Sequence, residues 1–150
     1  MDSLYLFNLI LRKAREEDLE GIEKIEKSSF PKTSIWKKDL LSKKRSNFPD
    51  FFIIAEINKK IVGYIFGTPG EIESIAVAKK WRRKKIGTAL LKKLITSFKK
   101  RGVKKITLHV RESNLSAISF YLKNNFKIVK KVENYYPGGE SALLMETTLS

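Results

Sequence analysis

Apolar residues along this chain follow two spacings, one typical of helices and one typical of strands. Recurrence at three- and four-residue steps predicts helices, and short β-branched or aromatic runs predict strands. The expected elements are a strand at 4–12, a helix that follows 16–18 and stops at Pro31, a short helix capped by Ser34, strands at 51–57, 61–66 and 71–77, a helix from about 86, a strand at 103–111, a helix capped by Ser113 or Asn114, and strands at 126–132 and 141–148. The pattern predicts a mixed α/β fold of order β-α-α-β-β-β-α-β-α-β-β, a central mixed sheet of about seven strands with flanking helices.

Basic residues separate the strand at 71–77 from the helix that follows it. Six of the seven residues from Lys79 to Lys85 are basic. A helix start presents unpaired N–H groups and the positive end of the helix dipole, so it attracts phosphate. Gly87 near that start lets a ligand approach the backbone closely. The turn is therefore a candidate phosphate site, and the alternative is a solvated charged turn between two core elements.

The strand at 71–77 carries an irregular pattern. Strict alternation would mix Glu71 and Glu73 with Ile75 and Val77 on one face. A one-residue bulge near 73–74 would let Ile72 share a face with the two apolar residues and turn the carboxylates away. The alternative is a mildly amphipathic strand with both glutamates in water. The strand–helix–strand unit at 71–111 should form a parallel crossover within the mixed sheet.

Composition limits the partners of the chain. Its 150 residues predict one domain over 1–150, and the net charge of +15 suits nucleic acid, an anionic membrane or a phosphorylated small molecule. Cysteine is absent and there is one histidine, so we expect no metal site. No window approaches the length of a membrane span, and residues 4–11 are expected to be a strand rather than a signal peptide. These features favour a cytoplasmic protein without a membrane role.

Four segments, in this order, resemble the GNAT superfamily, whose members transfer the acetyl group of acetyl-CoA to an amine. They are the basic turn and helix start IAV…WRRKKIGTALL, the strand ITLHVR at 106–111, the segment SNLSAISFYLKNNF at 113–126, and the tail YYPGGESALLM at 135–145. The tail resembles the protein N-terminal acetyltransferases, in particular the archaeal and ribosomal-protein-alanine branch. Lys85 departs from the family pattern, since it stands where a glycine is expected and raises the cost of a positive φ angle.

The resemblance implies acetyl-CoA as cosubstrate and a set of contacts for it. Backbone groups of the bulged strand would bind the pantetheine arm, the turn would bind the pyrophosphate, and the 113–126 segment would contribute further contacts. The implied residues are Ile75, Ala76, Val77, Arg82, Arg83, Lys84, Lys85, Ile86, Gly87, Thr88, Asn114 and Tyr121. Acceptor recognition would fall on Phe30 and Pro31 from one side and on Tyr135 and Tyr136 from the other.

The chemistry of amide formation states what the candidate catalytic residues must do. Only a neutral amine attacks the thioester, and an α-amino group (pKa about 8) loses its proton more easily than a lysine side chain (about 10.4). His109, the one imidazole, is the candidate base, as the resemblance also implies, and Glu71 and Glu73 are competing bases. The resemblance further implies that Tyr121 donates to the leaving thiolate. A hydrogen-bonded strand histidine and a core tyrosine are the alternatives. No covalent enzyme intermediate is required, which agrees with the absence of cysteine.

The sequence therefore predicts an acetyl-CoA-dependent N-acetyltransferase that acts on the α-amino group of protein or peptide N-termini by direct transfer. One alternative is a small-amine or polyamine acetyltransferase, although the +15 charge would repel a polycationic acceptor. An alternative of a different class is a basic RNA- or ribosome-binding module, but no RNA-recognition signature is present. Ribosome contact through the basic surface is compatible with catalysis on nascent chains.

Overall fold

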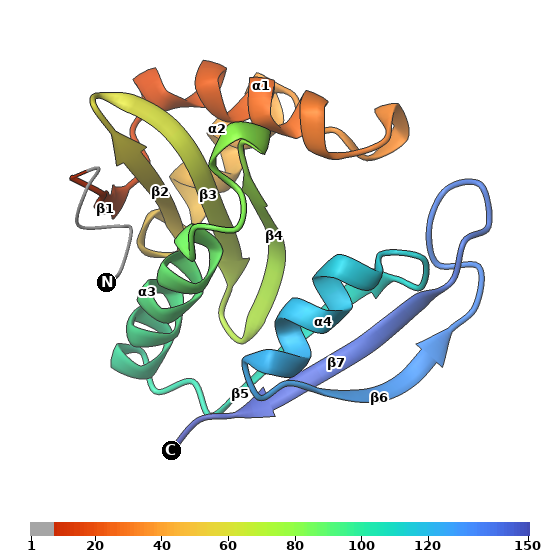
Figure 1. The fold of residues 1–150 in the computed structure, drawn as a ribbon. Coiled ribbons are helices and arrows are strands. Elements are labelled where there is room, and N and C mark those ends of the chain that lie inside the picture. Colours follow the sequence, from red (N-terminus) through yellow and green to blue (C-terminus); the bar gives the residue numbers. More distant parts are fainter. Residues whose placement is uncertain (1–7) are drawn as a thin grey trace.

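The computed structural model describes residues 8–150, which form a seven-stranded mixed sheet with four α-helices packed on it (Figure 1). The helices are α1 (Leu19–Ser29), α2 (Lys38–Asn47), α3 (Ile86–Lys100) and α4 (Leu115–Lys123). The strands are β1 (Ile10–Lys13), β2 (Phe52–Ile57), β3 (Lys60–Thr68), β4 (Glu71–Val77), β5 (Lys105–Arg111), β6 (Lys127–Val132) and β7 (Ala142–Thr148). The predicted fold class and element order are confirmed.

The sheet has the strand order β1-β2-β3-β4-β5-β7-β6 and separates two hydrophobic clusters. Buried residues of α3 and α4, such as Leu90 and Ile118, pack on one face. Buried residues of α1 and α2, such as Ile22 and Leu41, pack on the other. The amphipathic spacing that predicts these helices is therefore explained by burial against opposite faces of one sheet.

The predicted bulge in β4 is confirmed by its register against β3. Phe66 pairs with Ser74 and Gly67 pairs with Ile72, so Glu73 is the extra residue on β4. Ile72 lies in the cluster under α3, where Ile75 and Val77 also pack. The bulge thus places three apolar side chains on one face although their sequence spacing is irregular.

β4 and β5 form the one parallel pair of the described sheet, and they pair at only two positions. Glu71 is opposite Thr107 and Ile72 is opposite Leu108, with no pairing after the bulge. Figure 1 shows the sheet opening between β4 and the β5–β7–β6 portion. Beyond Ile72, therefore, β4 has no strand beside it on the β5 side.

Several predicted boundaries are wrong. Residues 8 and 9, expected in the first strand, precede β1, and the strand expected from 103 begins at Lys105. Ser34 does not cap the second helix, because α2 begins at Lys38 with Lys37 at its N-cap, while Ser34 ends the 3-10 turn Lys32–Ser34. β3 is longer than the 61–66 prediction. Residues 4–7 of the first predicted strand lie outside the described residues. No helix within residues 8–150 has the length and apolarity needed to cross a membrane.

Gly67 lies opposite the bulge, and a side chain there would collide with it. An added Cβ would lie 2.4 Å from the Glu71 carbonyl oxygen and 3.0 Å from Phe98 Cζ. We expect Gly67→Ala to lower the free energy of unfolding by about 2 kcal/mol or more, because neither neighbour can move without disturbing the core. Urea unfolding measures the change.

Gly21→Ala is the matched control, since a Cβ there would make an ordinary 3.5 Å contact with Ile61. Gly21 lies inside α1, so its replacement should raise the free energy of unfolding by roughly 0.5–1 kcal/mol. Equal effects of the two substitutions would show that Gly67 is not required by the bulge.

Candidate active site

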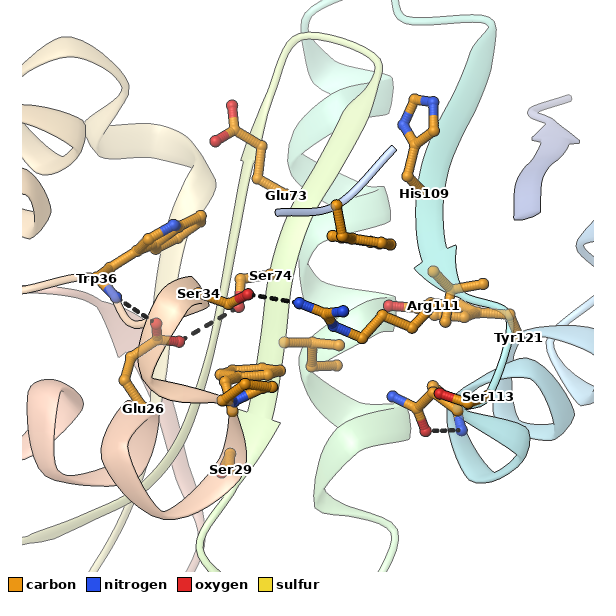
Figure 2. Close-up of a pocket in the computed structure, with 17 residues that line it drawn as sticks. Glu26, Ser29, Ser34, Trp36, Glu73, Ser74, His109, Arg111, Ser113 and Tyr121 are labelled. Atoms are coloured by element: carbon orange, nitrogen blue, oxygen red, sulfur yellow. Dashed lines mark hydrogen bonds between the residues drawn. The ribbon is translucent and has the colours of Figure 1, made fainter. Parts of the chain in front are cut away.

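A cavity of about 590 Å³ lies where β4 and β5 separate (Figure 2). Its walls come from the end of α1 and the segment before α2, from the bulged part of β4, from the end of β5, from α4, and from the segment between β6 and β7. The lining residues are Glu26, Ser29, Phe30, Pro31, Ser34, Trp36, Glu73, Ser74, Ile75, His109, Val110, Arg111, Ser113, Asn114, Ala117, Tyr121 and Tyr136.

The cavity brings together many, but not all, of the site residues expected from the sequence. Those that line it are Phe30, Pro31, Glu73, Ile75, His109, Asn114, Tyr121 and Tyr136. Tyr135 lies beside it, stacked on His109. The other candidates, which are outside the lining set, are Glu71, Ala76, Val77, and 82–88 in the turn and helix start.

His109 lies on β5, on the sheet face opposite to the core residues Leu108 and Val110. Its imidazole stacks on the Tyr135 ring with centroids 4.4 Å apart and an interplanar angle of 11°. Burial, with the nearby charges of Glu71 and Glu73, raises the pKa of Tyr135. The imidazole is therefore held in place by a neutral aromatic ring, with both carboxylates in the same region.

Glu73 is already engaged by a cation. Lys44 Nζ lies 2.7 Å from Glu73 Oε1, and the same ammonium group is 4.1 Å from the centroid of the Trp36 ring. Both partners of this ion pair are about four-fifths buried, at 18% and 22% side-chain exposure. The pair links α2 to the bulge, so a proton acceptor at Glu73 would compete with Lys44.

Tyr121 presents a hydroxyl group to the cavity from α4. Its ring packs edge-on against Phe120 and Phe126, with centroids 5.2 and 5.4 Å away. Burial raises the pKa of the phenol far above its usual value, so it keeps its proton. Within residues 8–150 this hydroxyl has no hydrogen-bond partner, and it is not sealed from the cavity. A neutral O–H donor is therefore available there.

The cavity also contains a buried carboxylate that the sequence reasoning missed. Glu26 on α1 is 1% exposed and accepts hydrogen bonds from the Trp36 N–H (2.8 Å) and from the Tyr64 hydroxyl. Ser74, directly after the bulge, is 2.9 Å from the Tyr64 hydroxyl. Its own hydroxyl donates to Glu26 Oε2 at 3.5 Å (Figure 2 shows the bond between Ser74 and Glu26). Burial raises the pKa of Glu26 to about 7, even though the Trp36 N–H bond acts in the opposite direction. One carboxylate thus connects α1, the segment before α2, and two central strands.

A signal for Glu26 was present in the sequence. It falls beside Ile22 and Ile25 on the apolar face of α1, where a charged side chain needs a buried partner. Ser34, Ser74 and Arg111 were missed as well, because the bond of Ser74 to Glu26 and the bond of Arg111 to Ser34 join segments far apart in the chain.

The basic turn forms the start of α3 as expected, with an unusual backbone. Lys85 is the N-cap with φ +64°, Arg83 has φ +63°, and no side chain caps the helix. A left-handed conformation costs a non-glycine residue about 1 kcal/mol, so the departure at Lys85 is tolerated at an energetic cost. The first N–H groups of α3 are thus left without a side-chain acceptor and can receive an anion.

Arg82 holds the end of β4 in place instead of lying against the helix start. Its Nε donates to the Val77 carbonyl oxygen (2.9 Å), and its Nη2 donates to Ser29 Oγ (3.2 Å). Gly87 leaves room at the helix start, because a Cβ there would come no closer than 3.5 Å to Phe120. Contacts within the chain therefore do not require a glycine at position 87. Close approach of a ligand to the backbone would explain why a glycine is present there.

Asn114 caps α4, since its side-chain oxygen accepts a hydrogen bond from the Ala117 N–H at 3.1 Å. Of the two predicted caps it is Asn114, not Ser113, that fills this role. Within residues 8–150 there is no cluster of three or more His, Cys, Asp or Glu side chains that could hold a metal ion.

A bulged strand that separates from its parallel neighbour, followed by an uncapped basic helix start, defines the class of acetyl-transferring enzymes to which this chain belongs. Residues 8–126 match the acetyltransferase (GNAT) family model. The chain is therefore a member of the GNAT family of acetyltransferases, as the sequence motifs predict.

Relatives and solved structures agree with this membership. The protein named "Uncharacterized N-acetyltransferase MJ1530" of Methanocaldococcus jannaschii is 39% identical over 142 residues, covering 91% of this chain and 90% of that protein. An N-alpha-acetyltransferase of Saccharolobus solfataricus is 33% identical over 156 residues, covering 93% and 92%. The crystal structure of Ard1 from Thermoplasma volcanium matches with a TM-score of 0.88 at 26% identity, covering 95% of this chain and 98% of that one.

The Glu26 carboxyl predicts a specific pH dependence of stability. Its pKa in the folded protein is about 7, raised from 4.5, so the folded state holds this proton more tightly than the unfolded state does. The stability contributed by the neutral form is complete below about pH 4.5 and is lost as the pH rises through 7. Glu26→Gln stays neutral and can still accept from Trp36. Relative to wild type, its free energy of unfolding should therefore rise by on the order of 2 kcal/mol between pH 5 and pH 8.

Chemical unfolding across this pH range measures the difference. Glu20→Gln, at an exposed position of the same helix, is the matched control and should give a curve parallel to wild type. A Glu26→Gln curve parallel to wild type would contradict the burial of an ionisable carboxyl at this site.

Proposed function

We propose that this chain transfers the acetyl group of acetyl-CoA to the α-amino group of protein or peptide N-termini. The observation that carries the proposal is one cavity, between separated parallel strands, lined by both an imidazole and a partnerless phenol hydroxyl. Relatives named N-alpha-acetyltransferase support the same acceptor class. The proposed cellular setting is the cytoplasm.

The reaction needs one proton acceptor and one proton donor. His109 accepts the proton of the attacking amine, directly or through a water molecule, as the new N–C bond forms. The C–S bond breaks, and Tyr121, which keeps its proton, donates a hydrogen bond to the departing thiolate sulfur. A backbone N–H of the bulged strand stabilises the charge on the carbonyl oxygen. Glu71 remains a competing base, and Glu73 is a weaker competitor because Lys44 is paired with it.

The cosubstrate contacts follow the splayed strands. Ile75, Ala76 and Val77 carry the backbone groups that would bind the pantetheine amides, since no strand pairs with them on the β5 side. The N–H groups from Arg83 to Thr88 would hold the pyrophosphate, with Lys84 and Lys85 adding positive charge. These residues bind and orient the cosubstrate, and they take no part in bond breaking.

The acceptor would enter between two aromatic walls. Phe30 and Pro31 form one wall, and Tyr135 and Tyr136 form the other. Burial, together with Tyr135, raises the pKa of Tyr136 to about 12, so its ring is neutral at physiological pH. The entrance between these uncharged walls suits the end of a flexible peptide chain, and Glu71 and Glu73 lie near it, where they could attract a cationic N-terminus. The basic surface would attract RNA and so favour contact with the ribosome, where N-termini emerge.

A peptide panel tests the proposal directly. The protein is incubated with acetyl-CoA and short peptides beginning Ser, Ala, Met-Leu or Met-Glu, with spermidine as the small-amine control. Acetylation of at least one peptide at its α-amino group, mapped by mass spectrometry, is the expected result. Acetylation of spermidine without any peptide would instead support the small-amine alternative.

His109→Ala should lower kcat at pH 7 by roughly 10²-fold, because a general base typically contributes that much or more. The pH–rate profile should change as well, because the proposed proton acceptor is gone. Glu71→Gln, measured alongside, should retain the wild-type profile. If the profile of His109→Ala is unchanged, the imidazole is not the base, and Glu71 and Glu73 remain as the candidates.

Tyr121→Phe should keep the affinity for acetyl-CoA and lose most of kcat. The hydroxyl has no partner within the described chain, so its removal leaves no buried group unsatisfied and the thermal midpoint should hardly move. Tyr64→Phe is the contrasting variant, because it breaks a hydrogen bond to Glu26 and should lower the midpoint. Equal losses of affinity and turnover in Tyr121→Phe would indicate a packing role.

A further inference from the structure

Arg111 reaches from the end of β5 across the cavity to the segment before α2. Its Nη2 donates to Ser34 Oγ at 2.8 Å, and its Nη1 lies 2.9 Å from Glu140 Oε1 (Figure 2 shows the bond to Ser34). The side chain is only 18% exposed. One guanidinium group therefore contacts both sides of the cleft.

The same guanidinium group also contacts the tyrosine wall, which is the acceptor wall formed by Tyr135 and Tyr136. Arg111 Cζ lies 4.1 Å from the centroid of the Tyr136 ring, and the Tyr136 N–H donates to the Glu140 carbonyl oxygen at 3.0 Å. The other carboxylate oxygen of Glu140 accepts from the Ser113 N–H at 3.0 Å. Hydrogen bonds from Ser113 and Arg111 lower the pKa of Glu140, so it remains charged. The tyrosine wall is thus tied to β5 and to the start of α4 through Arg111 and Glu140.

Strand pairing fixes the distance between β4 and β5 only at one end of the cleft, the closed end. β4 and β5 pair at Glu71–Thr107 and Ile72–Leu108, and they separate beyond those positions. Ser34 lies close in the chain to Phe30 and Pro31, which form the first acceptor wall. The Ser34–Arg111 bond therefore links that wall to the wall of Tyr135 and Tyr136 at the open end of the cleft. A planar guanidinium with several donors can hold both partners in fixed directions, which a lysine cannot do.

We infer that Arg111 is a positioning residue that fixes the separation of the two acceptor walls by bridging Ser34 and Glu140. This inference rests on the proposed function, because the walls are those assigned to the peptide acceptor. Arg111 does not take part in proton transfer. It acts through Ser34 and Tyr136, which border the path of the acceptor chain.

Steady-state kinetics with the full chain separate this role from a purely structural one. Ser34→Ala, Arg111→Lys and Arg111→Gln should each raise the KM for the peptide about 10-fold, since a hydrogen bond to a charged group is lost. The KM for acetyl-CoA should stay within about two-fold. Ser34→Thr, which keeps a hydroxyl, should restore most of the peptide affinity. Adding Ser34→Ala to Arg111→Gln should cause little further change, because both remove the same bond.

Matched controls lie outside the cleft. Arg101 forms an ion pair with Asp50 at an exposed position, and Ser42 Oγ donates to Glu16. Arg101→Gln and Ser42→Ala should leave both KM values unchanged. Thermal midpoints of all variants identify any that act through unfolding, and Ser34→Ala, which changes one hydroxyl in a turn, should remain folded.

The outcomes distinguish a failure of the positioning role of Arg111 from a failure of the proposed function. If wild type acetylates peptides but the Ser34 and Arg111 variants keep its peptide KM, the positioning role is wrong and the proposed function stands. An equal rise in the KM for acetyl-CoA also rejects the positioning role, because it places Arg111 in cosubstrate binding. If wild type acetylates no peptide, the proposed function fails and the inference about Arg111 fails with it.

Discussion

The separation of β4 from β5 is the constraint on which the rest of the site depends. A sheet normally pairs every backbone group of an interior strand, yet here the parallel pairing stops after Ile72. The extra residue at Glu73 bends β4 away, and Ser74 to Val77 then have a partner on the β3 side alone. The cavity and the unpaired strand backbone lie where the β4–β5 pairing stops, directly after that inserted residue.

Such an opening in a sheet needs support, and the polar groups around it supply this support. On the α1–α2 side, Glu26 joins Trp36 and Tyr64, and Lys44 joins Glu73. At the open end, a guanidinium and a serine connect the two halves. Buried polar networks of this kind cost stability unless every member is satisfied, and within residues 8–150 no buried side-chain N or O atom lacks a partner. Tyr121 is different, because its hydroxyl faces the cavity.

Most of the fold could be predicted from the sequence, and the candidate site only in part. Local signals indicated the bulge near Glu73 and the start of α3, and they narrowed the cap of α4 to Ser113 or Asn114, of which Asn114 fills the role. The start of α2 was misplaced because Ser34, a good N-cap by residue type, does not cap that helix. Its hydroxyl oxygen accepts a hydrogen bond from Arg111, which is 77 residues away. Glu26 was overlooked for the same reason, since its partners Tyr64 and Ser74 come from strands that no local pattern connects to α1.

The most direct test of the cleft is an NMR titration of isotopically labelled protein with coenzyme A. If the pantetheine arm lies between the separated strands, backbone amide signals of residues 73–77 and 83–88 should shift most and saturate together. Signals from α2 and from the outer strand β6 should stay close to their starting positions. Shifts concentrated on those outer elements, with residues 73–77 unaffected, would contradict the claim that the opening between β4 and β5 is the cosubstrate site.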